Sequence, residues 1–368
     1  MKRIPLQILF SILVILITGI SCNSYKPSTV ISIRGNKFYI NDIPTYNGRN
    51  WNGNTIEGLL FNSRMVQGIF DDINPETVDL WKYPDTDSWD SNRNTNEFVK
   101  SMEDWYRSGM LSFTLNLQGG SPTAIGNEGW VNSAFNEDGS LKKRDFTRLY
   151  RILKKADQLG MTPILGLFYF GQDEVLKDEE AVVAAVNNTI NWLFESGFRN
   201  VLIEINNECD VEYDHEILMP DRVHELIDSV RFNTREGERF LVGTSFGGGS
   251  LPKRDVVNVS DFILLHGNGV DNPDDLRELI RKTKVMPSYN AQPVIINKDD
   301  HYGFDEEDYN LKAAVESYAS WGYFDYRRQG DSIEDGFQSI PVDWSINSER
   351  KHAFFNRLHE ITGGFQDE

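Results

Sequence analysis

A carboxylate and two amides directly follow an apolar run near the middle of the chain. Residues 201–205 read VLIEI, and Asn206, Asn207 and Glu208 come next. A carboxyl group at the end of a buried strand suits general acid–base catalysis, because partial enclosure raises its pKa toward neutrality and an adjacent amide can hold a hydroxyl group. A glutamate in this position can also serve only to hydrogen-bond a loop. Asn207 and Glu208 are therefore the first candidate catalytic pair.

A second polar cluster, Asn297 to His301, follows the apolar run at residues 293–296. In an extended chain alternate side chains share a face, so Asp300 is expected beside Lys298, with Asp299 on the other side. A lysine removed from water can also act as a nucleophile and form a Schiff base. Asp299, Asp300 and His301 could bind a cation, but three adjacent residues rarely converge without distant partners. We therefore predict no metal site and no cofactor.

Strands and helices alternate along the chain and position these clusters. Apolar runs rich in Val, Ile, Leu and Phe are typical of parallel strands buried on both faces. They lie at residues 58–71, 111–117, 161–170, 201–206, 240–244, 262–266, 293–297 and 323–326. Helical patterns lie at residues 94–109, 145–160, 179–197, 222–238, 273–284, 306–321 and 348–361, and only the fifth unit lacks a clear helix.

This alternation favours an α/β fold, a single-domain (β/α)8 TIM barrel preceded by an N-terminal β-hairpin at residues 30–44. A doubly wound open sheet is the alternative, but no Gly-x-Gly-x-x-Gly motif follows an early strand. In a barrel, the loops that leave the carboxyl ends of the strands build the active site. The side chains near predicted strand ends that could contact a ligand are Arg64, Asn116, Gln118, Tyr169, His266, His301 and Trp321.

The pair Asn207–Glu208 at the end of the fourth predicted strand resembles the retaining (β/α)8 glycoside hydrolases, the clan that includes cellulases and β-galactosidases. The resemblance covers about residues 30–365 and includes the opening hairpin. It implies that Glu208 is the acid/base and that Asn207 contacts the 2-hydroxyl of the reacting sugar. It also implies a second carboxylate at the end of the seventh strand, about 5–5.5 Å from the first in retaining enzymes and about 6.5–9.5 Å in inverting ones.

Lys298 departs from this resemblance, because it stands where the clan has its nucleophilic glutamate. Similar exported bacterial proteins read Asn-Glu-Asp-Asp-His where this chain has residues 297–301. A lysine cannot form the glycosyl ester, and its positive charge favours ionised Glu208, which lowers the pKa of the proposed acid. Asp300 could replace the missing nucleophile or act as the base of an inverting reaction, or it could simply belong to a loop turn.

The amino end carries the features of a targeting segment. Lys2 and Arg3 precede an apolar run at residues 4–17, and small residues lead to Cys22. This order is typical of a secretory signal peptide. Gly19 to Cys22 followed by a polar stretch resembles a bacterial lipobox, in which the cysteine is lipidated. We therefore predict a signal peptide at residues 1–21, a lipidated Cys22, a linker at residues 22–29 and a catalytic domain at residues 30–368.

The composition limits the classes of partner and of chemistry that we expect for this protein. The formal net charge of −19 disfavours binding to nucleic-acid phosphates. Two cysteines, Cys22 and Cys209, exclude a disulfide scaffold, and we expect Cys209 to be a buried structural thiol. The sequence lacks the Gly-x-Ser-x-Gly motif that is typical of serine hydrolases, so it does not indicate one. The composition does not indicate an oligomeric state.

Three functions remain open from the sequence. The first is an exported, membrane-anchored glycoside hydrolase that acts on the O-glycosidic bonds of an oligo- or polysaccharide through Glu208. The second is a catalytically inactive relative that binds glycans, impaired by Lys298. The third is a barrel in which Lys298 forms a Schiff base with a carbonyl compound. The sequence specifies neither the sugar nor the linkage.

Overall fold

The computed structural model describes residues 25–120 and 129–365. The predicted signal peptide and the predicted lipidation site Cys22 lie outside the described residues. Within the described part, no helix is both long and apolar enough to cross a bilayer.

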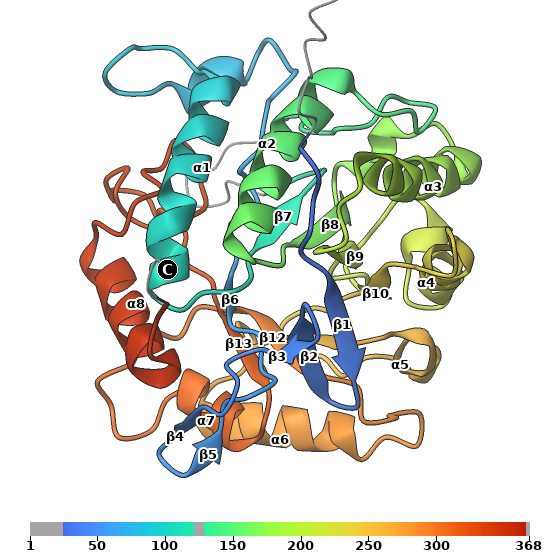
Figure 1. Cartoon of the computed structure of the whole chain (residues 1–368). Coiled ribbons are helices and arrows are strands. Elements are labelled where there is room, and N and C mark those ends of the chain that lie inside the picture. Colours follow the sequence, from blue (N-terminus) through green and yellow to red (C-terminus); the bar gives the residue numbers. More distant parts are fainter. Residues whose placement is uncertain (1–24, 121–128, 366–368) are drawn as a thin grey trace, which may run out of the picture.

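Eight short parallel strands form the centre of the molecule (Figure 1). They are β6 (Asn62–Ser63), β7 (Thr114–Asn116), β8 (Ile164–Tyr169), β9 (Leu202–Asn207), β10 (Leu241–Gly243), β11 (Ile263–His266), β12 (Val294–Asp299) and β13 (Ser320–Tyr323). One sheet has the order β10-β9-β8-β7 and the other β11-β12-β13-β6.

Two contacts bring these sheets together into one ring. A parallel bridge between Arg64 and Thr114 joins the end of β6 to β7. On the opposite side, the Asp261 N–H donates to the Val242 carbonyl at 2.9 Å, which links the chain entering β11 to β10. The predicted (β/α)8 barrel is therefore confirmed, and the candidate residues at its strand ends share one rim.

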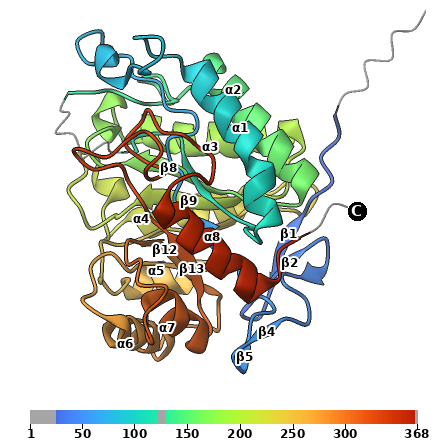
Figure 2. The same cartoon turned by 90° about the vertical axis from the view of Figure 1, so that its left-hand side faces the viewer.

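Helices surround the strands, as Figures 1 and 2 show. They are α1 (Ser91–Arg107), α2 (Lys143–Leu159), α3 (Glu179–Ser196), α4 (Val223–Phe232), α5 (Arg254–Val259), α6 (Pro273–Lys284), α7 (Asn310–Glu316) and α8 (Glu349–Thr362), with 3-10 turns at Val78–Trp81, Asp173–Val175 and Glu216–Leu218. Side-chain caps start several of them: Asp90 accepts from two backbone N–H groups of α1, and Asn272 from one of α6. The left-handed Gly160 ends α2, a conformation that glycine adopts without a Cβ clash.

The opening hairpin is confirmed and gains a third strand. Strands β1 (Ile31–Arg34), β2 (Lys37–Ile40) and β3 (Ile43–Pro44) form an antiparallel sheet. A smaller hairpin of β4 (Asn50–Trp51) and β5 (Asn54–Thr55) follows it. Phe38 of β2 is fully buried, so this sheet packs onto the barrel as part of the same core.

Two predicted helix boundaries are wrong, for local reasons. The helix predicted at residues 306–321 extends only over α7, because Tyr318 adopts a left-handed φ of 49° and the chain then enters β13. The helix predicted at 222–238 stops at Phe232, and Arg235 pairs with Glu238 in a tight turn instead. The fifth unit does have a helix, the short α5.

The residues just before β1 are held against the far end of α2. The backbone N–H groups of Ser28 and Thr29 donate to the Asp157 carboxylate at 3.0 and 2.8 Å, and the Tyr25 hydroxyl donates to the same carboxylate. Asp157 lies at the end of α2 that leads into β8, so this attachment lies at the amino ends of the barrel strands.

Candidate active site

Glu208 lies at the centre of a group of polar side chains at the carboxyl ends of β9, β11 and β12. The Lys298 Nζ donates to Glu208 Oε1 at 2.6 Å, and His266 Nδ1 lies 2.9 Å from the same oxygen. The Lys298 and Glu208 side chains are only 10% and 9% exposed. The barrel thus joins residues 90 positions apart in the sequence into a buried ion pair.

Asn207 is fixed by its neighbours on both sides. Its side-chain oxygen accepts from Arg64 Nη2 at 2.7 Å, and its backbone carbonyl accepts from the Tyr213 hydroxyl at 2.6 Å. Its side-chain nitrogen lies 3.4 Å from Glu208 Oε2. Arg64 comes from the end of β6, so the first and fourth strands of the barrel meet at this amide.

The backbone of Glu208 turns sharply where β9 ends. Its φ of 54° lies in the left-handed region, which costs a non-glycine residue about 1–3 kcal/mol and is common at functional sites. Ser245 stabilises this turn: its hydroxyl accepts from the Glu208 N–H at 3.0 Å, and its carbonyl accepts from the Cys209 N–H at 2.9 Å. The hydroxyl also donates to Glu204 Oε1 at 2.6 Å.

The two glutamates of β9 have opposite protonation tendencies. Burial favours the protonated form of Glu208, but the hydrogen bond and charge of His266 and the charge of Lys298 outweigh it and hold the pKa of Glu208 well below its ordinary value. Burial raises the pKa of fully buried Glu204, although Arg64 counteracts this. Burial lowers the pKa of His266 to about 4 and also lowers that of Lys298, which the nearby Arg64 charge reinforces. Their surroundings therefore favour the ionised form of Glu208 and the protonated form of Glu204.

A cavity of about 210 Å³ opens beside this group. Its lining combines cationic, amide, acidic and aromatic side chains: Arg64, Tyr169, Phe170, Asn268, Lys298, Asp300, Phe324, Tyr326 and Gln338. Four of the predicted residues therefore share one cavity, namely Arg64, Tyr169, Lys298 and Asp300. This volume is below the roughly 300–1,000 Å³ of sites for drug-sized ligands, and it suits a single ring.

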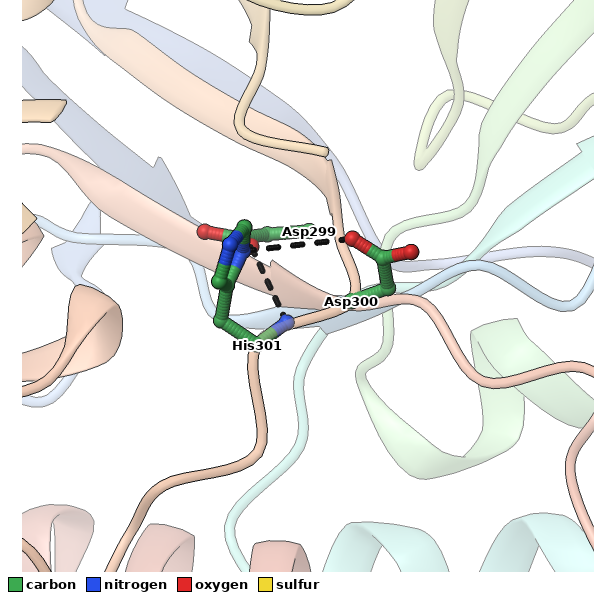
Figure 3. A group of neighbouring side chains, drawn as sticks. All are labelled: Asp299, Asp300 and His301. Atoms are coloured by element: carbon green, nitrogen blue, oxygen red, sulfur yellow. Dashed lines mark hydrogen bonds and ion pairs between the residues drawn. The ribbon is translucent and has the colours of Figure 1, made fainter. Parts of the chain in front are cut away.

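Three ionisable residues lie close together where β12 ends, with the polar atoms of Asp299, Asp300 and His301 within 4.8 Å of one another (Figure 3). Asp299 is fully buried and accepts from Trp321 Nε1 at 2.8 Å, Asn310 Nδ2 at 2.9 Å and His301 Nδ1 at 2.6 Å. The hydrogen bond from His301 to Asp299 raises the pKa of that histidine. One carboxylate oxygen of Asp300 faces His301 Nδ1 at 3.9 Å (Figure 3), Asp300 also lines the cavity, and burial raises its pKa.

Five predicted contacts lie outside the cavity lining: His266 and His301, described above, and Trp321, Gln118 and Asn116. Trp321 is fully buried between Phe304 and Phe354, where its indole N–H holds Asp299. Gln118 is fully buried and donates to Ser133 Oγ and to the Gln172 carbonyl at 3.0 and 3.1 Å. Asn116 is 1% exposed and lies against Gly166, where an added Cβ would meet its side-chain oxygen at 2.4 Å.

Sequence reasoning missed the aromatic and amide residues of the cavity and the buried Glu204. The sequence places the last strand at residues 323–326, whereas β13 spans Ser320–Tyr323, so Phe324 and Tyr326 lie beyond the end of the strand and not within it. Asn268 follows β11 in the same way. The signal for Glu204 was a single carboxyl group inside an otherwise apolar strand.

Among the described residues, two groups have the composition of a cation site. The first is Asp299, Asp300 and His301, whose buried member already accepts three side-chain hydrogen bonds. The second is Asp173, Glu174 and Asp214, of which only Asp173 is buried. Cys209 is fully buried, and burial raises the pKa of its thiol, which makes it unreactive.

Comparisons with known proteins identify the fold. No family model matches the sequence, and no curated protein matches it. Among solved structures, the chain is similar to an endo-1,4-β-mannanase from Rhizomucor miehei, with 10% identity over 91% of this chain and 99% of that one and a TM-score of 0.56. It is also similar to a glycoside hydrolase candidate from Bacteroides vulgatus, with 13% identity, a TM-score of 0.53 and coverage of 86% of this chain but only 57% of that one.

A third similar structure contains a bound sugar. It is a variant of a glycoside hydrolase family 5 enzyme from Prevotella bryantii in complex with a xyloglucan tetradecasaccharide, with 12% identity over 82% of this chain and 95% of that one and a TM-score of 0.50. At these identities the comparisons establish the architecture alone. The chain therefore has a glycoside hydrolase-like barrel fold.

Proposed function

We propose that this protein binds carbohydrate in the cavity beside Glu208 and hydrolyses O-glycosidic bonds weakly or not at all. The ion pair between Lys298 Nζ and Glu208 Oε1, at 2.6 Å, carries this proposal. A general acid must hold a proton at the working pH, and this pair stabilises the ionised form of Glu208 instead. The glycoside hydrolase-like fold and the sugar bound to the Prevotella bryantii enzyme support a carbohydrate ligand.

The cavity has the chemistry that a sugar ring requires. Tyr169, Phe324 and Tyr326 offer aromatic surface for the apolar face of a ring, and Asn268 and Gln338 offer amides for its hydroxyl groups. By the resemblance of β12 to the seventh strand of the hydrolase clan, Lys298 takes the place of the second carboxylate. Its ammonium group cannot form a glycosyl ester.

A matched set of variants tests this proposal. Hydrolysis of aryl glycosides and of a glycan panel is measured for the natural chain, for Lys298→Glu and for Lys298→Glu combined with Glu208→Gln. We expect turnover only in Lys298→Glu, because this change removes the cation beside Glu208 and adds a second carboxylate, whereas the double variant lacks the acid. Sugar binding by the natural chain is measured calorimetrically on the same panel. Turnover by the natural chain at the rate of Lys298→Glu contradicts the proposed impairment.

A second candidate function is an active hydrolase that uses Asp300 as its second carboxylate. The presence of Asp300 in the same cavity as Lys298 favours it. In this case the natural chain hydrolyses a substrate and Asp300→Asn abolishes the reaction. The hydrogen bond from Lys298 to Glu208 opposes Schiff-base chemistry, because it favours the ammonium form, which is not nucleophilic, whereas burial and the nearby Arg64 charge lower the pKa of Lys298 and act in the other direction.

We also propose that the protein is exported and held at a membrane through a lipid on Cys22, as the lipobox-like sequence indicates. Mass spectrometry of the protein from membranes of an expressing bacterium tests this. The expected amino terminus is a diacylated Cys22, and Cys22→Ser should release the chain from the membrane fraction. An unmodified terminus contradicts the proposal.

A further inference from the structure

Arg64 has unused hydrogen-bonding capacity at the cavity. The residue is only 1% exposed, and a single guanidinium nitrogen, Nη2, donates to Asn207. Its Nε and Nη1 atoms are buried and lack an acceptor among the described residues. Buried guanidinium N–H groups are almost always paired, and in proteins their preferred partner is a planar anion that accepts two bonds.

Lys298 brings a second cation to the same place. The Lys298 Nζ lies 5.3 Å from the centre of the Phe324 ring, and the Arg64 guanidinium carbon lies 6.0 Å from the same centre. Both side chains line the cavity, and their mutual repulsion contributes to the lowered pKa of Lys298. Two like charges are therefore held together beside one ring.

The nearby acidic groups do not saturate these cations. Glu208 accepts from Lys298, and Arg64 has no carboxylate within ion-pair distance in the described part of the chain. Glu204 Oε1 accepts a hydrogen bond from the Ser245 hydroxyl, and burial disfavours the ionised form of Glu204. Asp300 lies at the cavity with a side chain 26% exposed, and its ion-pair neighbour is His301 at 3.9 Å.

We infer that the cavity takes a saccharide unit that carries an anionic group, such as the carboxylate of a uronic acid or a sulfate ester, and that Arg64 and Lys298 hold this group. The inference rests on the proposed carbohydrate binding and specifies its ligand class. Arg64 and Lys298 both line the cavity, and Lys298 keeps free donors besides the one to Glu208, so an anion bound there meets both positive charges. The Phe324 ring lies within 6.0 Å of both cations, and the other aromatic and amide residues of the lining remain for the rest of the sugar ring.

The test compares ligands that differ only in charge. Binding is measured by calorimetry for trigalacturonate, for its fully methyl-esterified form, and for a neutral and a sulfated galactan oligosaccharide. We expect the acid to bind at least tenfold more tightly than its ester, and the affinity for the acid to fall with added salt. A preference for the sulfated over the carboxylated sugar identifies sulfate as the anion and also supports the inference.

Charge recognition is assigned to particular residues with the variants Arg64→Gln, Arg64→Lys and Lys298→Met. The matched control is Lys253→Met, which changes an exposed lysine. We expect the ratio of acid to ester affinity to fall at least tenfold in Arg64→Gln, less in Arg64→Lys, and not in the control. This ratio separates charge recognition from a structural role, because a distorted site weakens both ligands equally. Equal binding of the acid and the ester by the natural chain overturns the inference and leaves carbohydrate binding intact. Binding of none of the four sugars overturns both.

Discussion

Replacing Lys298 with methionine removes one partner of the buried pair with Glu208 and keeps most of the aliphatic length of the side chain. The pair is 2.6 Å long, and both side chains are about nine-tenths buried. Breaking such a pair leaves an uncompensated buried charge and costs about 3–5 kcal/mol, far more than a surface pair. We therefore expect Lys298→Met to lower the free energy of unfolding by about 3–5 kcal/mol at pH 7, measured by urea denaturation.

The chain contains a close control for this experiment. Lys253 and Asp221 form an ion pair of 2.5 Å, but their side chains are 49% and 85% exposed. An exposed pair contributes about 0–1 kcal/mol, so Lys253→Met should have little effect. The comparison holds the residue types and the distance nearly constant and changes only the burial.

Adding Glu208→Gln to Lys298→Met should recover part of the lost stability, because the double variant contains no buried unpaired charge. The double-mutant cycle then gives the coupling energy of the pair. A loss no larger than that of Lys253→Met, or a coupling below about 1 kcal/mol, would refute the reasoning that this ion pair holds Glu208 in its ionised form.

Three further predictions concern neighbouring groups. The pKa of Glu208 is lowered on folding, so ionised Glu208 adds to the free energy of unfolding at pH values above its unfolded pKa. This stabilisation is lost as the pH falls toward the folded pKa. Glu208→Gln should therefore flatten the acid side of the curve of stability against pH. The pKa of Glu204 is raised, so stability is lost as the pH rises from its unfolded toward its folded pKa; Glu204→Gln should remove this loss, and an unchanged profile in urea titrations contradicts it. Trp321→Phe removes the 2.8 Å bond to Asp299 and should cost about 1.5–3 kcal/mol by the same assay, whereas a neutral effect means that Asp299 is satisfied without it.

The barrel could be predicted because its strands are distinctive. The apolar run of β8 and the start of β9 belong to strands that are buried at every position, as is typical of a parallel sheet covered on both faces. The last helix–strand unit is harder to predict from sequence, because residues 310–323 contain a short helix and a strand separated by only three residues. Helical periodicity does not register the left-handed Tyr318 that separates them.

The site could be predicted in part. Residues that end strands, such as Glu208 and Lys298, were found because the topology brings all carboxyl ends to one rim. Whether a side chain near the end of a strand points into the core or into the cavity depends on local irregularities in strand pairing, which the sequence does not reveal. A register shift in the pairing of β12 with β13 occurs between Ile296 and Asp299, and Trp321 turns into the core while Phe324 reaches the cavity.

The attachment of Tyr25, Ser28 and Thr29 to Asp157 has a consequence for how the molecule is presented to its surroundings. Cys22 is three residues before Tyr25, so the lipid proposed on Cys22 would lie no more than about 11 Å of chain from this attachment. The attachment is at the amino ends of the strands, and the cavity is at their carboxyl ends, a six-residue strand or about 20 Å away. With the lipid proposed above in place, a tether this short would hold the base of the barrel to the bilayer and direct the opening outward, where long polymers could reach it without passing between protein and membrane.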